Sequence, residues 1–139
     1  MDTLTFLKNV EGVSSTVYLD SLGYATIAVG LCVDAKVPGA GLRPEEIDWL
    51  TNNRLNLARQ KLSQQFSWFS LLDEVRKTVV LSMYWQVGDL GKWPRFCNAM
   101  AMRDYVEASN EMLDSKVAKE EAPARWQRQA HMMISGGWA

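Results

Sequence analysis

The sequence predicts an α+β fold that is predominantly α-helical, with a small N-terminal β-hairpin lobe and a C-terminal helical bundle. Two β-prone runs, at residues 16–19 and 24–27, flank a segment with the composition of a turn. From residue 43 onward, apolar residues recur at helical spacing and proline or acidic residues mark helix starts. At 139 residues and 47% hydrophobic, the chain has the size of one compact domain.

The first helix is predicted over the residues before Gly12. Asp2 and Thr3 can cap its start, and Gly12 is a natural stop after its last turn. Its apolar residues fall on one stripe: Leu4, Leu7 and Val10. Glu11 is left at the C-terminal end, where the negative end of the helix dipole, with any burial against the stripe, favours the protonated carboxyl. Such a group can act as a general acid.

The hairpin that follows carries a second carboxylate. Asp20 lies at its mouth, where solvent and neighbouring N–H groups would keep the side chain ionised, and Thr26 on the returning strand offers a hydroxyl near both acids. Two carboxyls in different environments and a group that can hold a water suit hydrolysis of a glycosidic bond. The alternative is purely structural, because helix ends, turns and strands commonly contain Glu, Asp and Thr respectively.

The remaining elements are helical. Residues 32–41 form an irregular segment, and a long helix over 43–62 follows because Pro44 suits the first position and Glu45 and Glu46 complement the dipole. A central helix from about residue 72 to 87 is apolar on nearly every side and should be buried.

Asp104 with Glu107 predicts a capping box. Pro123 begins the last helix, whose apolar stripe follows: Trp126, Ala130 and Met133. An aromatic-rich cluster is expected to fill the core: Phe66, Trp68, Phe69, Leu71 and Leu72.

Several short motifs are shared with one enzyme family. The N-terminal ones are Glu11-Gly12, Tyr18-Leu19-Asp20, Gly23-Tyr24-Ala25-Thr26-Ile27 and Gly30. Together they resemble the catalytic segment of the phage-type lysozymes, glycoside hydrolase family 24. The ending Met83-Tyr84-Trp85-Gln86-Val87-Gly88 and the region Ser115 to Arg128 are also similar to segments of that family.

Two positions depart from the family pattern. Ala28 replaces a glycine, which is possible only if its backbone keeps a negative φ. Leu31 replaces a histidine that makes a structural ion pair in relatives, so the small lobe must be stabilised in another way.

The resemblance implies a single lysozyme-like domain over residues 1–139. A helix at residues 1–12 would pack on the helical lobe, and residues 13–42 would form a small, shortened β-lobe. Residues 43–62 would be the connecting helix, and residues 63–139 the helical lobe.

The resemblance also implies a set of site residues. Glu11 would be the general acid, and Asp20 and Thr26 would position the attacking water. Gln86 would face the substrate cleft, with Trp85 beside it as a surface for sugar stacking, although Gln86 can also be a satisfied core amide. Arg125 falls where relatives keep an arginine that pairs with the catalytic glutamate and orients it, although it can also be an ordinary surface charge.

The implied activity is that of a peptidoglycan hydrolase, an endolysin or muramidase that cleaves the β-1,4 bond between N-acetylmuramic acid and N-acetylglucosamine. Its partners would be peptidoglycan glycan strands, and the protein would be a monomer. We expect it to be made in the host cytoplasm without a signal peptide and to reach the wall after release with the help of a holin.

Composition excludes other classes of function. A net charge of −1 and a pI near 5.8 provide no overall positive field of the kind that drives nucleic-acid binding, and leave only local patches open. No apolar run is long enough to span a membrane. Cys32 and Cys97 are expected to be free thiols, and His131 is isolated, so we expect no metal site and no cofactor.

Two alternatives belong to other classes. The first is a catalytically reduced module with a lysozyme fold that binds peptidoglycan or belongs to a virion. The intact Glu11, Asp20 and Thr26 argue against it, whereas Ala28, Leu31 and the short lobe favour it. The second is a helical partner-binding protein whose hairpin matches by accident, and this alternative predicts no affinity for saccharides.

Overall fold

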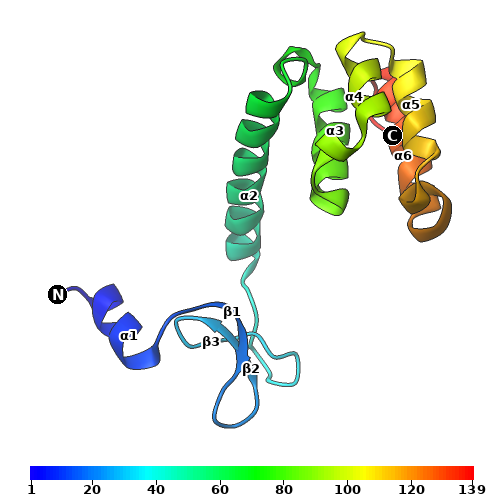
Figure 1. Cartoon of the computed structure of the whole chain (residues 1–139). Coiled ribbons are helices and arrows are strands. Elements are labelled where there is room, and N and C mark those ends of the chain that lie inside the picture. Colours follow the sequence, from blue (N-terminus) through cyan, green and yellow to red (C-terminus); the bar gives the residue numbers. More distant parts are fainter. The chain divides into compact units, whose positions relative to one another are not determined.

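The computed structural model describes all residues from Met1 to Ala139. The fold is α+β and predominantly helical, with one three-stranded antiparallel sheet, as the sequence predicts. The chain divides into two compact units, Met1–Thr51 and Asn52–Ala139. The first contains helix α1 and the sheet, and the second contains the helices that follow α2 (Figure 1).

Helix α1, Thr3–Glu11, begins and ends at the predicted signals. The Asp2 carboxylate accepts a hydrogen bond of 2.7 Å from the backbone N–H of Thr5, and Gly12 ends the helix at a φ of 77°. No residue of α1 is buried, so nothing in its own unit covers its apolar stripe. The packing of this helix on the helical lobe stays a prediction.

The sheet consists of β1 (Ser14–Leu19), β2 (Ala25–Ala28) and β3 (Leu31–Cys32), in that order. The first two strands confirm the predicted hairpin. The third was not predicted, because a two-residue strand is too short to show a period. Tyr18 pairs with Thr26 across the first two strands, and Thr26 in turn pairs with Cys32.

Helix α2, Pro44–Gln65, starts at the predicted proline and ends at Gln65 rather than at residue 62. Its first turn is closed by the Glu46 side chain, which accepts a hydrogen bond of 2.8 Å from the Arg43 N–H. Only Ala58 and Leu62 of its apolar stripe are buried, and both belong to the second unit. The exposed remainder of the stripe lies in the N-terminal part of the helix.

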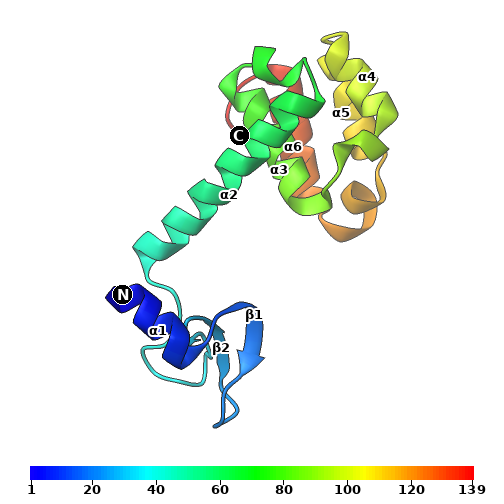
Figure 2. The same ribbon diagram turned by 60° about the vertical axis from the view of Figure 1, so that its left-hand side comes forward.

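The second unit is a helical bundle (Figures 1 and 2). Its elements after α2 are η1 (Phe69–Leu71), α3 (Glu74–Val87), η2 (Leu90–Lys92), α4 (Pro94–Ala101), α5 (Tyr105–Leu113), the π-helical turn η3 (Val117–Glu121) and α6 (Pro123–Ser135). The predicted capping box at α5 is half formed: Asp104 accepts from the Glu107 N–H at 3.0 Å, but the Asp104 N–H donates to the Ala99 carbonyl instead of the Glu107 side chain. Pro123 starts α6 as predicted. The π-helical turn was not predicted.

The core lies in the second unit. Its largest fully buried side chains include Trp126, Phe69, Phe96, Leu62 and Met83. The aromatic cluster is largely internal, as predicted, since Trp68, Phe69 and Leu72 are buried. Leu71 corrects this prediction: its side chain is 72% exposed, because it lies in the short helix η1, which turns one residue away from the core.

Candidate functional site

Glu11 is placed by the end of α1 and by the turn between β2 and β3. A Cβ built at Gly30 would lie 2.9 Å from Oε2 of Glu11 and 3.3 Å from its Cδ. The carboxyl therefore occupies the space that any side chain at position 30 would need. Glu11 is exposed, so the burial against the apolar stripe that the sequence allowed for is not found within the first unit.

The turn that carries this contact is strained. Ala28 has a φ of 60° and Gly30 a φ of 66°. The expectation that Ala28 keeps a negative φ is therefore wrong. Ala28 is the last residue of β2, directly before the two-residue turn to β3, and it takes left-handed backbone there although it carries a Cβ. Strain of this kind is found at functional sites as well as in tight turns.

Asp20 closes the turn between β1 and β2. Its Oδ1 accepts hydrogen bonds of 2.9 Å from the N–H groups of Leu22 and Tyr24, as expected for a carboxylate at the mouth of a hairpin. The backbone N–H of Asp20 donates to the Tyr24 carbonyl at 2.9 Å. Only Oδ1 has partners in the protein, so Oδ2 is left to accept from water or to face a positive charge.

Thr26 lies in the middle strand and is the buried residue of the first unit, at 3% exposure. Its hydroxyl donates a hydrogen bond of 3.0 Å to the Tyr24 carbonyl. No group of the protein donates a hydrogen bond to the Thr26 hydroxyl oxygen, so its acceptor capacity is unused within the protein. Burial and the bond to the Tyr24 carbonyl together fix the orientation of the side chain.

Glu11, Asp20 and Thr26 are all attached to the same small sheet. Asp20 follows β1, Thr26 pairs with β1 and β3, and Glu11 contacts the turn that joins β2 to β3. The backbone of Tyr24 links two of them, because it bonds both Asp20 and Thr26. This unit thus carries an exposed carboxyl, a carboxylate with one free oxygen and an oriented hydroxyl.

Leu31 lies in β3 and pairs with Ile27, and another side chain supports the sheet. The Asp34 carboxylate accepts hydrogen bonds of 2.9 Å from the N–H groups of Ala25 and Lys36. These bonds, that of Ala25 first, lower the pKa of Asp34. They tie β2 to the segment after β3 without the histidine of the family pattern.

Gln86 lies at the end of α3 in the second unit. Its Oε1 accepts a hydrogen bond of 3.0 Å from the indole N–H of Trp126, so half of the amide has a structural partner. The side chain is only partly buried, and its NH₂ group makes no hydrogen bond within the protein. The two readings of this residue are therefore compatible, since Gln86 anchors a core indole and keeps two donors free.

Arg125 lies near the start of α6 beside Ser82 of α3. Its Nη2 donates to the Ser82 hydroxyl at 2.9 Å, and Gln129 donates to the same oxygen at 2.7 Å. Gln129 is 8% exposed, and its Oε1 has no partner. Together with Arg128, these residues line a pocket of about 360 Å³ in the second unit. Arg125 is thus more than an isolated surface charge, because α3 holds one edge of its guanidinium.

Trp85 is 51% exposed and projects from α3. It lines a pocket of about 440 Å³ between α3 and the C-terminal half of α2. A half-exposed indole beside a pocket is available to a ligand, and its role in sugar stacking stays a prediction.

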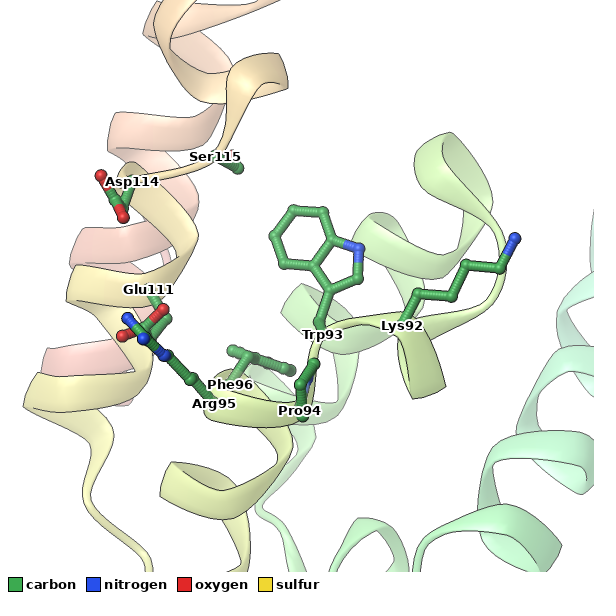
Figure 3. A pocket seen from close by; sticks show the side chains of 8 residues that line it. All are labelled: Lys92, Trp93, Pro94, Arg95, Phe96, Glu111, Asp114 and Ser115. Carbon is green, nitrogen blue, oxygen red and sulfur yellow. The ribbon is translucent and has the colours of Figure 1, made fainter.

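A further pocket, of about 330 Å³, was not predicted (Figure 3). The Trp93 indole lines it and stacks on Trp126 with ring centroids 5.6 Å apart, and Trp126 in turn bonds Gln86. Charged and hydroxyl groups surround it: Lys92, Arg95, Glu111, Asp114 and Ser115. A hydrogen bond from Lys119, with its charge, lowers the pKa of Asp114. From the sequence, Lys92-Trp93-Pro94 was predicted only to break the helix. Its position beside α5 results from tertiary packing, which leaves no local sequence signal.

Other kinds of site are not indicated. No group of three or more His, Cys, Asp and Glu side chains is arranged to hold a metal ion. Both cysteines are free, and burial raises the pKa of the Cys97 thiol. None of the helices combines the length and apolarity needed to cross a bilayer.

Comparison of the chain with models of known protein families and with curated proteins gave no match.

Proposed function

We propose that the protein is a peptidoglycan hydrolase that cleaves the β-1,4 bond between N-acetylmuramic acid and N-acetylglucosamine. The observation that carries the proposal is the Glu11 carboxyl, which occupies the space left by Gly30 on the sheet that also holds Asp20 and Thr26. A pair of carboxyls with different surroundings is what glycoside hydrolysis requires. The resemblance to phage-type lysozymes supplies the substrate.

The proposed reaction begins with proton transfer from Glu11 to the glycosidic oxygen. Positive charge then develops on the sugar, and the ionised Asp20 stabilises it through the oxygen that the turn leaves free. Asp20 and Thr26 together hold the attacking water. The resemblance implies entry of water opposite the leaving group, with inversion at the anomeric carbon.

The resemblance also implies supporting roles for three residues of the second unit. The free NH₂ group of Gln86 suits the carbonyl of an N-acetyl group, and Trp85 offers an aromatic face to a sugar ring. For Arg125, the resemblance implies pairing with the catalytic glutamate. Its guanidinium is held by Ser82 through one nitrogen only, which leaves the other N–H groups for a carboxylate.

The proposed protein works as a monomer without a cofactor, and its partners are the glycan strands of the cell wall. It reaches them after release from the host cytoplasm, with a holin providing the passage.

The test is the loss of turbidity of outer-membrane-permeabilised Gram-negative cells. Wild type should clear the suspension, and Glu11→Gln should not, because an amide cannot donate the proton. Glu45→Gln, an exposed helix position that pairs with Arg43, is the matched control and should clear as wild type does. Clearing by folded Glu11→Gln at near-normal rate would refute the assignment. No clearing by any variant would favour the wall-binding module.

A further inference from the structure

The groove between α2 and α3 combines an aromatic wall with two free cations. Trp85 and Tyr84 come from α3, and Arg54, Leu57 and Lys61 from α2. Trp85 is 51% exposed and Leu57 is 47% exposed, so the apolar part of the groove is open to a ligand. All of these residues belong to the second unit.

The positive charge of this groove is not neutralised within the protein. Neither Arg54 nor Lys61 takes part in any of the ion pairs or side-chain hydrogen bonds, whereas Arg59 on the same helix is paired with Glu74 at 2.9 Å. Asp89, just beyond the end of α3, is held by Gly91 and Gln65 instead. Two unpaired cations beside an aromatic surface are complementary to an anionic ligand that also has an apolar part.

The spacing of the two cations limits the kind of anion. Arg54 and Lys61 are seven positions apart and lie on one face of α2, so their attachment points are about 10 Å apart along the helix. An extended peptide spans that distance in about three residues. Two separated cations beside an apolar wall fit a short acidic peptide with an aliphatic part, and binding of an oligonucleotide is tested below as the other outcome.

We propose that this groove binds the peptide stems of peptidoglycan through their free carboxylates. The inference rests on the proposed function for the identity of the polymer. It assigns Arg54 and Lys61 to the stem carboxylates, and Leu57 to the aliphatic part of the stem. In an intact wall the lactyl carboxyls of the glycan are already amide-linked, so the stems carry the free carboxylates.

The experiment measures co-sedimentation of the full-length protein with purified Gram-negative sacculi on ice. One portion of the sacculi is left intact, and in the other the carboxylates are converted to amides by carbodiimide coupling with ammonia. Arg54→Gln/Lys61→Gln is compared with wild type and with Lys36→Gln/Lys116→Gln. That control pair removes the same charge at exposed positions outside the groove. Muropeptide release from the same sacculi is followed separately.

Amidation should weaken binding of wild type and of the control by about fivefold to tenfold. Arg54→Gln/Lys61→Gln should bind both wall preparations equally, at the level that wild type shows on the amidated wall. The proposal would be overturned if wild type bound intact and amidated sacculi equally well. It would also be overturned if Arg54→Gln/Lys61→Gln still bound intact sacculi better than amidated ones. So would wild type that binds a single-stranded oligonucleotide but not sacculi.

The two proposals fail in different readouts. Muropeptide release without any effect of amidation on binding leaves the hydrolase standing and removes the stem groove. The expected binding pattern without muropeptide release keeps the groove and removes the catalytic assignment.

Discussion

Ala28 is one of two non-glycine residues with a positive φ, the other being Arg103. At a φ of 60° its Cβ is crowded by the neighbouring carbonyl, which costs about 1–2 kcal/mol. Ala28→Gly removes that cost and adds less than about 1 kcal/mol of unfolded-chain entropy, so we expect a net stabilisation of about 0.5–1 kcal/mol. Urea unfolding followed through the NMR amide signals of β2 measures it.

Ala25→Gly is the control for this prediction, because Ala25 lies in β2 and has no positive φ. There the same change should only destabilise, by about 0.5–1 kcal/mol. Equal effects at both positions would mean that Ala28 carries no strain.

Substitution of Gly30 is expected to change activity as well as stability. Gly30→Ala would place a Cβ 2.9 Å from Oε2 of Glu11 and would strain a backbone whose φ is 66°. We expect lysis to fall by at least about tenfold through a lower kcat, since the acid is moved from its place. Gly23→Ala has a comparable φ of 84° with nothing within 4 Å of the new Cβ, and it should lose stability without a comparable loss of kcat.

At the residue scale, sequence predicted the local settings of the proposed catalytic residues and missed their surroundings. The cap of Asp2, the stop at Gly12 and the turn at Asp20 depend on neighbours in the chain, so short-range rules find them. Other contacts join segments that are distant in the chain. Glu11 lies against Gly30, and Trp126 connects Gln86 to Trp93. No spacing rule contains such contacts.

At the scale of elements, Arg76 joins α3 to α6. Its guanidinium donates to the carbonyls of Met133 at 2.7 Å and Ile134 at 2.8 Å, pairs with Asp73 at 2.9 Å and lies 3.9 Å from the ring centre of Tyr105. Lysine cannot reproduce this fork, so Arg76→Lys should cost about 2 kcal/mol of unfolding free energy.

Thermal or urea unfolding by circular dichroism gives this value. Arg59→Lys changes an exposed pair with Glu74 and should cost less than about 1 kcal/mol. A similar loss in the two variants would contradict the role given to Arg76.

The Asp34 carboxylate, which connects β2 to the segment after β3, makes the stability of the sheet sensitive to acid. The pKa of Asp34 is lowered by hydrogen bonds from the Ala25 and Lys36 N–H groups. Its stabilising effect is therefore fully present above about pH 4, the ordinary value for Asp, and is lost as the pH falls through the lowered value.

Asp34→Asn should weaken the sheet at pH 7 and flatten the loss of stability between about pH 4 and pH 2. Amide exchange of β2 at several pH values follows it. Asp48→Asn, an exposed position on α2 without such bonds, should leave the acid limb unchanged. If the wild-type sheet were equally stable at about pH 4 and at about pH 2, the Asp34 hydrogen bonds would not be what stabilises it.

Elements with strong local signals were the ones that sequence located. The long helix and the last helix start at prolines, the central helix is capped by Asp73 and is apolar on nearly every side, and the structure has all three close to the predicted bounds. The two-residue strand β3 and the π-helical turn η3 have neither signal, because tertiary contacts rather than local preference stabilise them.

At the scale of the whole molecule, the buried side chains are unevenly distributed. Those of the core come from Ala58 onward, and the first unit contributes only Thr26. The proposed catalytic residues thus belong to the unit with little core of its own. This agrees with a general tendency for functional segments to be drawn from the less stable parts of a protein.

The central claim is that Glu11 serves as the acid of a muramidase. Mass spectrometry of the products released from purified sacculi tests it most directly, with wild type and Glu11→Gln compared at equal, folded concentrations. We predict that wild type releases muropeptides ending in reducing N-acetylmuramic acid and that Glu11→Gln releases none. Release of the same products by Glu11→Gln, or products cut at any other bond by wild type, would contradict it.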